Sequence, residues 1–194
     1  EPLTGLDNEV KENFLVKLLE ITNQYGLIVL YVSHHTDEIK LISNEVIYMV
    51  NKIGKHVSSV EHGQIEDFIK NPPSIGALQA FSDTDQNMIN IRNLKINGTS
   101  ISHNNYFISE ECHYLGFAND EIYFVREGGI EFITVSQTSL YTILKIFDSN
   151  QFIKIKTNDF IQKNCEMFSF LQFGGKTHQF NQNGIRINNR GKNT

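Results

Sequence analysis

Hydrophobic and polar positions follow two different periods along the chain, and the change comes near residue 73. Before it, four apolar positions recur at the spacing of one helix face, namely Val10, Phe14, Leu18 and Ile21. They predict a helix over Asn8–Tyr25. Asp7 is a suitable N-cap for this helix, and Gly26 is a suitable stop.

Short helices and strands alternate through the rest of the first part. Leu27–Val32 is a continuous apolar run, which is typical of a strand buried on both faces of a parallel sheet. The other expected segments are a helix over 36–42, a hairpin of 45–50 with 56–60 around a turn at 52–55, and a helix over 64–70. Pro72-Pro73 ends the last helix, so the alternation predicts an α/β unit over residues 1–73.

After Ser74 the apolar positions alternate with a period of two. Strands are expected over 88–94, 99–102, 106–109, 121–126, 130–135, 139–148, 152–157 and 166–172, with a helix over 76–81. Short strands joined by Asn, Gly and Asp turns favour a small antiparallel barrel. The predicted fold class is therefore α/β followed by all-β, with domains at 1–73 and 74–173.

Charge is distributed unevenly along the 194 residues. The sequence has 22 acidic and 17 basic residues, but residues 174–194 hold only basic ones. The acidic body argues against a large nucleic-acid surface. The Gly/Asn/Gln-rich end predicts a basic, disordered tail. No apolar run approaches the roughly 18 residues that a membrane-spanning helix needs.

Metal-ligating side chains are scattered. Cys112 and Cys165 are far apart and lack the Cys/His spacing of a zinc site, so reduced structural thiols are expected. His103 and His113 have no carboxylate at ligand spacing. The sequence therefore predicts no metal site.

Two chemically useful side chains fall where strands of the first part would end. Glu1 opens the chain, and His34 follows the run Leu27–Val32. In an open α/β sheet such ends meet at the carboxyl edge, where ligands bind. A carboxylate there can orient an attacking water, and a histidine can donate to a phosphate oxygen. Spacing alone favours a plainer alternative, with Glu1 as a terminal charge and His34 as a surface cap before Thr36.

The ordered set of motifs over 1–73 resembles the second half of the nucleotide-binding subunit of ABC transporters. Glu1 matches the catalytic glutamate that ends the Walker B strand, and Thr4-Gly5-Leu6-Asp7 matches the D-loop. Ser33-His34 matches the switch histidine and its neighbour, and Asp37-Glu38 matches the acidic pair that follows.

This resemblance implies a role for each matched residue. Glu1 would be the general base that activates the hydrolytic water. Ser33 and His34 would bind nucleotide, with His34 in contact with the γ-phosphate of ATP. Asp7 would act across a nucleotide-sandwich dimer. His35 has no role in the family and is expected to face solvent.

Other ABC motifs are missing from the sequence. Gly175-Lys176-Thr177 imitates the end of a GxxxxGK[ST] loop, but Phe170 stands where its first glycine is needed. The Q-loop, the LSGGQ signature and the Walker B aspartate are also absent, and the family places them all before the catalytic glutamate. The chain, which begins at Glu1 rather than Met, is thus expected to be the C-terminal part of such a subunit. ATP and Mg²⁺ would belong to the intact protein, and this chain alone is expected to be inactive and to bind neither tightly.

The second part resembles the C-terminal OB-like regulatory (TOBE) domain of importer ATPases for sulfate or molybdate, sugars, polyamines and ferric iron. Ile122–Glu127 matches a strand that ends in Arg-Pro-Glu in the family, with the proline lost. Phe81 and Asn87 also fall at family positions. Family members use this domain for dimerisation and for regulation by small molecules or partner proteins. Lys154 and Lys156 share a strand face, which is expected to face solvent, with contact to an oxyanion as the alternative.

We therefore expect a fragment of the ATP-hydrolysing subunit of an ABC importer, with a slight preference for an oxyanion such as molybdate or sulfate. Its partners would be a second copy and a membrane permease, at the cytoplasmic face of the inner or plasma membrane, and no nucleic acid is expected. The alternative is a non-enzymatic regulatory, dimerisation or small-ligand-binding β-domain with an inert ATPase remnant. A third hypothesis, an unrelated α/β hydrolase that uses Glu1 and His34, lacks a GxSxG nucleophile elbow.

Overall fold

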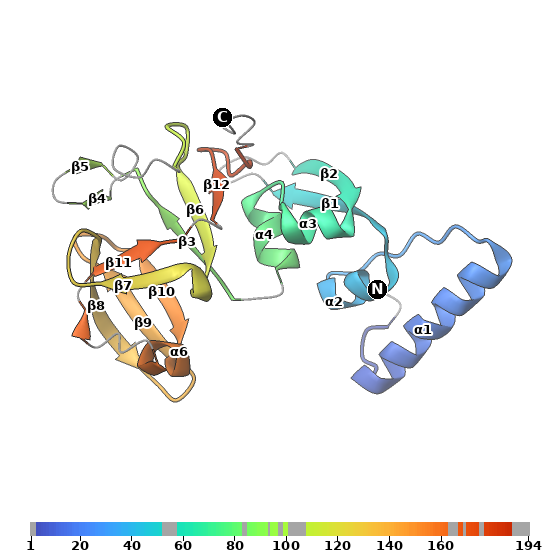
Figure 1. Cartoon of the computed structure of the whole chain (residues 1–194). Helices are drawn as coiled ribbons and strands as arrows, with labels where there is room; N and C mark the ends of the chain where they lie inside the picture. Colours follow the sequence, from blue (N-terminus) through green and yellow to red (C-terminus); the bar gives the residue numbers. More distant parts are fainter. Residues whose placement is uncertain are drawn as a thin grey trace.

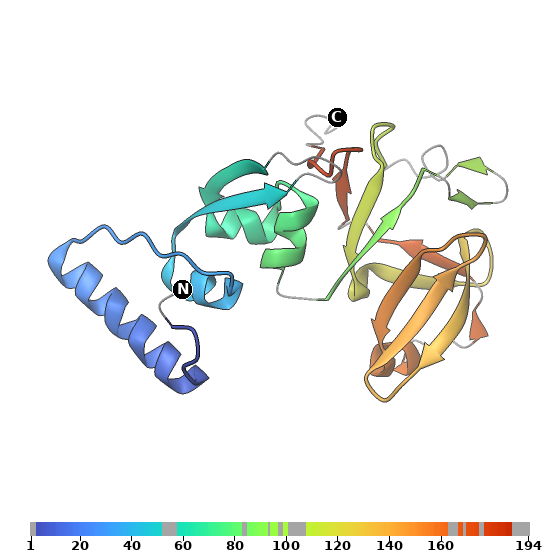
Figure 2. The same ribbon diagram turned by 180° about the vertical axis from the view of Figure 1, so that it is seen from behind.

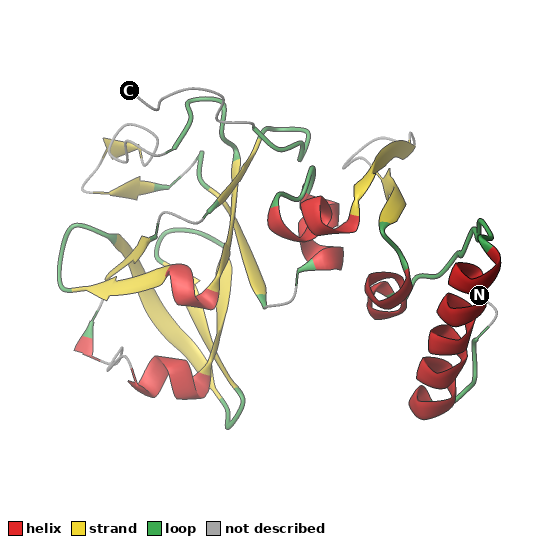
Figure 3. Cartoon of the chain, turned by 45° about the vertical axis from the view of Figure 1, so that its right-hand side comes forward, coloured by secondary structure: helices red, strands yellow, loops and turns green. Residues whose placement is uncertain are grey.

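The computed structural model of the chain describes residues 3–51, 58–82, 85–92, 94–96, 99–100, 108–162, 167–168, 170–174 and 177–187. Helices and one hairpin make up the first part, and antiparallel strands dominate the later part (Figure 1, Figure 3). Helix α4 (Ile75–Phe81) lies between the hairpin and the strands in the front view and from behind (Figure 2). This confirms the coarse expectation of mixed helices and strands followed by a mostly β part.

Every helix expected from the sequence is present. The described helices are α1 (Asn8–Tyr25), α2 (Thr36–Ile42), α3 (Ile65–Lys70), α4, α6 (Thr157–Gln162) and the short 3-10 helix η1 (Asn119–Glu121). The first four agree with the expected segments to within one residue at either end. None of the described helices has the length and hydropathy needed to cross a bilayer.

The ends of α1 are those that the sequence predicts. The Asp7 carboxylate accepts a hydrogen bond of 3.0 Å from the backbone N–H of Val10, as an N-cap does. At the other end Gly26 has a φ of 61°, and its N–H donates to the carbonyl of Thr22. Glycine tolerates this left-handed backbone because it has no Cβ.

The buried face of α1 differs from the predicted apolar stripe. Leu15 is buried, whereas Val10 and Phe14 are each 45% exposed. Figure 1 shows the reason, since α1 runs away from the rest of the chain and has α2 as its main neighbour. A periodic stripe predicts a helix, but its burial depends on another element that packs against it.

Leu27–Val32 does not form the predicted strand. The segment crosses from α1 to α2 as a loop and pairs with no strand of the described chain (Figure 1). Ile28 is 100% exposed and Leu30 is 83% exposed. A strand needs a neighbour for its backbone hydrogen bonds, which an apolar sequence alone does not supply. The strand prediction is wrong here, and the segment is an exposed apolar loop.

The expected hairpin is present. It consists of β1 (Glu45–Asn51) and β2 (Ser58–Gln64), which pair antiparallel with Glu45 opposite Gln64. Residues 52–55, expected to form its turn, lie outside the described residues.

The later strands form three antiparallel sheets. They are β3 (Gln86–Asn90), β4 (Lys95–Ile96), β5 (Thr99–Ser100), β6 (Tyr114–Ala118), β7 (Ile122–Val125), β8 (Ile130–Gln137), β9 (Tyr141–Ile146), β10 (Phe152–Lys156), β11 (Phe170–Phe173) and β12 (His178–Phe180). The strand orders are β10-β9-β8-β11-β7, β12-β6-β3 and β4-β5. Among the described strands the backbone pairing gives these separate sheets and no closed barrel, so the barrel stays a prediction.

The sequence does not predict β6. Gly116 stands at its centre and lowers its strand propensity. A Cβ at this position would meet a terminal methyl of Leu78 and crowd Phe180, so the packing of these elements favours glycine, and a larger residue would force the Leu78 side chain to move. The strands expected after Ser74 overlap observed ones except 106–109, of which 106–107 lie outside the described residues.

Strand β12 lies in the segment 174–194, for which we expect a disordered tail. It pairs with β6, and beyond it the N–H of Arg186 donates to the carbonyl of Pro73 at 2.8 Å. The structure thus differs from the expectation over 177–187, because backbone groups there find partners in distant parts of the chain. Residues 188–194 lie outside the described residues.

Two apolar clusters meet at α4, apart from the main core among the strands. The first contains Ile39, Val46, Phe68, Ala77 and Phe81, and the second contains Ile75, Leu78 and Phe180. The ring of Phe81 packs edge-to-face on Tyr48 of β1, with centroids 5.4 Å apart. Helix α4 therefore packs against the hairpin through one cluster and against β12 through the other.

Candidate functional site

The D-loop motif forms an exposed turn directly before α1. The N–H of Leu6 donates to the carbonyl of Leu3 at 3.3 Å, and Gly5 has a φ of 86°, which glycine adopts easily. Leu3 is buried, whereas Thr4, Gly5 and Asp7 are exposed. The Asp7 carboxylate serves as the N-cap of α1, and the turn is anchored by one apolar side chain.

The predicted switch residues stand between the exposed loop and α2. His34 is exposed, and its ring lies 4.0 Å from that of His35 between centroids, at 37°. His34 lies at the surface, as the plainer alternative expects, but the N-cap residue of α2 is His35, without a side-chain cap bond. His35 is exposed, as expected. Glu1, the other predicted catalytic residue, lies outside the described residues.

The carboxylate of Glu38, on α2, accepts hydrogen bonds from two side chains that precede His34. Glu38 Oε2 accepts a hydrogen bond of 2.7 Å from the Tyr31 hydroxyl and one of 2.8 Å from the Ser33 hydroxyl. Ser33 Oγ in turn accepts the backbone N–H of His35 at 3.0 Å. These bonds tie the end of the apolar loop to the first turn of α2.

Helix α1 supplies the counter-charge for this carboxylate. Lys11 Nζ lies 3.8 Å from Glu38 Oε1, and the two side chains are only 17% and 11% exposed. Lys11 is one helical turn after Asp7, so the ion pair links the start of α1 to α2, the helix that follows His34. A cleft of about 270 Å³ lies between α1 and α2 and is lined by Asn8, Lys11, Glu12, Leu15, His35, Asp37, Glu38 and Leu41.

The environment shifts the ionisation of two groups in this cluster. Burial raises the pKa of Tyr31 to about 12, with added contributions from the hydrogen bond and the negative charge of Glu38. Burial is the largest influence on Glu38 and acts to raise its pKa, but the hydrogen bonds from Tyr31 and Ser33 and the positive charges of His35 and Lys11 together hold that pKa below its ordinary value. Glu38 is thus an ionised acceptor at neutral pH, and Tyr31 is a protonated donor.

The arrangement can present one imidazole to an anion from a fixed backbone. His34 is exposed on a segment whose neighbours on both sides are hydrogen-bonded, so it is suited to donate to a phosphate oxygen. The described residues contain no group of three or more side chains that could hold a metal ion.

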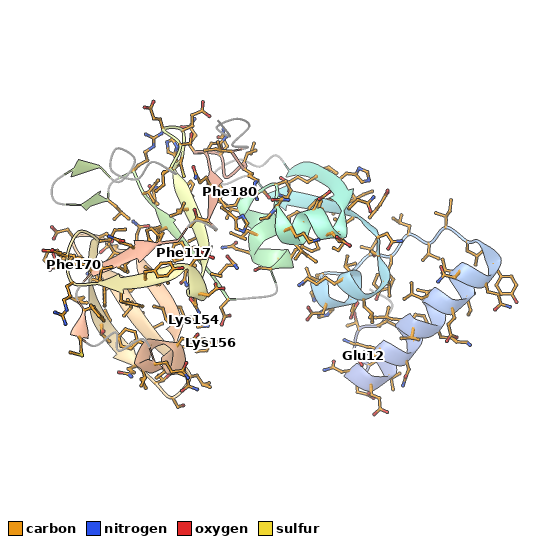
Figure 4. All side chains as sticks on the ribbon, in the orientation of Figure 1. Glu12, Phe117, Lys154, Lys156, Phe170 and Phe180 are labelled. Atoms are coloured by element: carbon orange, nitrogen blue, oxygen red, sulfur yellow. The ribbon has the colours of Figure 1, made fainter. Side chains whose placement is uncertain are left out.

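The predicted residues of the β part have mainly structural roles. Lys154 Nζ lies 3.6 Å from the centre of the Tyr141 ring, and Lys154 and Lys156 are both exposed on β10 (Figure 4). The solvent-facing expectation for these lysines is confirmed. Asn87 is buried and bonded to the backbone of Lys154, and Cys112 is a buried free thiol. Cys165 lies outside the described residues.

The chain matches no protein-family model, and no curated protein matches it significantly. The residues and their geometry therefore carry the functional argument.

Sequence reasoning missed the side chains that organise the switch segment. It paired Glu38 with Asp37 as a motif, without a role for Tyr31, Ser33 or Lys11 in holding Glu38. Ser33 and Glu38 give a partial signal, because a serine before a helix and a glutamate in its first turn both commonly form hydrogen bonds near a helix N-terminus, usually to backbone N–H groups. Lys11 carries no local signal, since its contact with Glu38 comes from the packing of α1 on α2.

Proposed function

We propose that residues 1–73 are the D-loop and switch part of an ABC-type ATPase and that residues 74–173 are its OB-like regulatory domain. The whole ATPase would power uptake of a small solute, with an oxyanion such as molybdate or sulfate preferred. It would work as a dimer beneath a permease at the cytoplasmic face of the membrane.

One observation carries this proposal. The D-loop motif and Ser33-His34 are far apart in the sequence. The Lys11–Glu38 ion pair nevertheless joins α1, which follows the D-loop motif, to α2, which follows Ser33-His34. An ATPase that works as a nucleotide-sandwich dimer needs these two motifs at one end of the domain. The exposure of His34 supports its contact with a phosphate.

In this mechanism each residue has a limited task. His34 donates to the γ-phosphate of ATP, where charge develops as the bond to the leaving group breaks. Glu1 accepts a proton from the attacking water. Asp7, at the end of the D-loop turn, faces the second copy of the domain.

The residues present fit only one end of a nucleotide. His34 can meet a terminal phosphate, but this sequence has no glycine-rich loop before a helix that would cradle the other phosphates. In the proposal these groups, and the binding of Mg²⁺, come from residues outside the printed sequence.

Calorimetry on the 194-residue chain tests whether it lacks the residues that bind the rest of the nucleotide. We expect no ATP binding at micromolar concentration, with or without Mg²⁺. Micromolar affinity would show a complete nucleotide site in this chain and would contradict the proposal.

The second candidate is a non-enzymatic β-domain that dimerises or binds a small anion. The outer face of β8–β10 favours it, because Ile133 and Phe152 are about half exposed and flank Lys145 in the strand register. Sedimentation of the chain, alone and with molybdate, tungstate or sulfate, separates the candidates. A stable dimer that Ile133→Lys disrupts supports this second function, and a monomer that binds none of the anions argues against it.

A further inference from the structure

We propose that Glu38 is a positioning residue that holds the backbone around His34 in the conformation needed for phosphate contact. The inference rests on the proposed function and assigns how its switch segment is kept in place. Glu38 does not touch the nucleotide in this account, and it acts through Ser33 and Tyr31.

The first step is the relay of hydrogen bonds around His34. The Ser33 hydroxyl donates to Glu38 Oε2 at 2.8 Å and accepts the His35 N–H at 3.0 Å. The residue before His34 and the peptide after it are therefore fixed by one hydroxyl. Because Ser33 has a single proton to donate, an acceptor at Glu38 leaves its lone pairs free for the His35 amide.

The second step is the anchoring of the loop that leads to His34. Leu27–Val32 has no strand partner in the described chain, so the loop lacks the ladder of backbone hydrogen bonds that a sheet would supply. The Tyr31 hydroxyl binds the same oxygen of Glu38 at 2.7 Å. Two hydroxyls on one carboxylate oxygen thus connect an exposed loop to α2 just before the histidine.

The third step is the charge that keeps Glu38 an acceptor. Its side chain is 11% exposed, and the ammonium of Lys11 lies 3.8 Å away on α1. A buried carboxylate without such partners would tend to take up a proton and would then lose acceptor capacity. The ion pair also links the position of the switch segment to the helix that follows the D-loop motif.

The length of the side chain matters as much as its charge. Glutamine retains one acceptor oxygen but gives up the charge that faces Lys11. Alanine removes both. Aspartate keeps the charge on a stem shorter by one methylene, which withdraws the acceptor from the two hydroxyls.

Amide hydrogen exchange and histidine-ring NMR on the full 194-residue chain test the inference. In Glu38→Ala we expect exchange of the His35 amide to speed up about tenfold, the change that corresponds to one ordinary hydrogen bond. The His34 ring resonances should broaden or split, while the amides of Thr36–Ile42 that bond within α2 keep their protection. Asp37→Asn, which changes the neighbouring carboxylate, is the matched control and should leave both readouts unchanged.

Further variants separate positioning from folding. Ser33→Ala should release the His35 amide as Glu38→Ala does, and Ser33→Thr, which keeps a hydroxyl, should restore it. Glu38→Gln should protect the His35 amide partly but lower the titration midpoint of Tyr31 from about 12 towards that of an ordinary tyrosine. An unchanged His34 ring in a folded Glu38→Ala or Ser33→Ala chain would overturn the inference. No readout involves nucleotide, so failure of the ATPase proposal would be recognised separately.

Discussion

The guanidinium of Arg186 donates to Nδ1 of His178 across 3.1 Å, and this pair joins two segments of the chain's later part. Because an arginine has no acceptor, the imidazole must present a lone pair and so be neutral. Burial, aided by the positive charge of Arg186, lowers the pKa of His178 to about 4. Arg186 also holds Asn71, just before Pro72-Pro73, so the pair stabilises the junction between the two parts.

This pair predicts loss of stability in mild acid. The folded-state pKa of His178 lies below the unfolded value near 6.5, so its full contribution is present above pH 6.5 and is lost as the pH falls towards 4. The expected loss is about 1–2 kcal/mol, reduced for partial exposure, measured by urea unfolding at pH 7.5 and pH 4.5. His178→Gln should flatten this difference, whereas His62→Gln, at an exposed site, should not. If the difference in unfolding free energy between pH 7.5 and pH 4.5 were the same in the two variants, His178 would not be the group responsible.

Asn87 predicts a large structural penalty. Its side chain accepts the N–H of Lys154 at 2.7 Å and donates to the carbonyl of Lys154 at 2.9 Å, as a paired strand would. Asn87→Ala removes this partner from both part-buried backbone groups, together with the buried hydrogen bond from Asn87 to the Asn119 side chain, and should cost about 2–4 kcal/mol in chemical unfolding. Asn87→Asp should cost at least as much, because a carboxylate cannot donate to that carbonyl. The control Asn13→Ala, on the exposed face of α1, should stay within about 0.5 kcal/mol, and a similarly small effect at Asn87 would refute the pairing.

The exposed loop Leu27–Val32 predicts self-association of the isolated chain. Ile28 is 100% exposed, so Ile28→Lys removes apolar surface without disturbing packing. We expect the variant to keep its unfolding midpoint and to raise the concentration at which light scattering detects aggregates. Val46→Lys, at a buried site, should instead lower the midpoint. Unchanged aggregation in Ile28→Lys would show that self-association does not take place through this loop.

Features that depend on contacts within one turn could be predicted from the sequence, whereas features that depend on distant parts of the chain could not. Asp7 and Gly26 set the ends of α1 through contacts within one turn, so the sequence alone predicts them. Leu27–Val32 has the composition of a buried strand but no partner in the described chain, and composition cannot reveal a missing neighbour. Strand β12 shows the reverse case, because its polar surroundings predict a tail while pairing with β6 orders it.

In the candidate site, too, local motifs could be predicted from the sequence and long-range contacts could not. The positions of Thr4–Asp7 and Ser33-His34 come from motifs in the sequence; Thr4–Asp7 and His34 are exposed, and Ser33 is half-buried. The ion pair of Lys11 with Glu38 depends on how α1 packs against α2, and no periodicity predicts it.

The most direct measurement is ATP hydrolysis by a fusion that places the 194-residue chain after the Walker A, Q-loop and signature segment of an active importer ATPase. The account predicts hydrolysis by the fusion and a loss in kcat of about 100-fold or more in His34→Ala, as expected when a group that stabilises transition-state charge is removed. His35→Ala, at the adjacent imidazole, should stay within about twofold of the parent fusion. A folded fusion that binds ATP but does not hydrolyse it, or one in which the His34→Ala variant is as active as the His35→Ala variant, would contradict the assignment of the switch histidine.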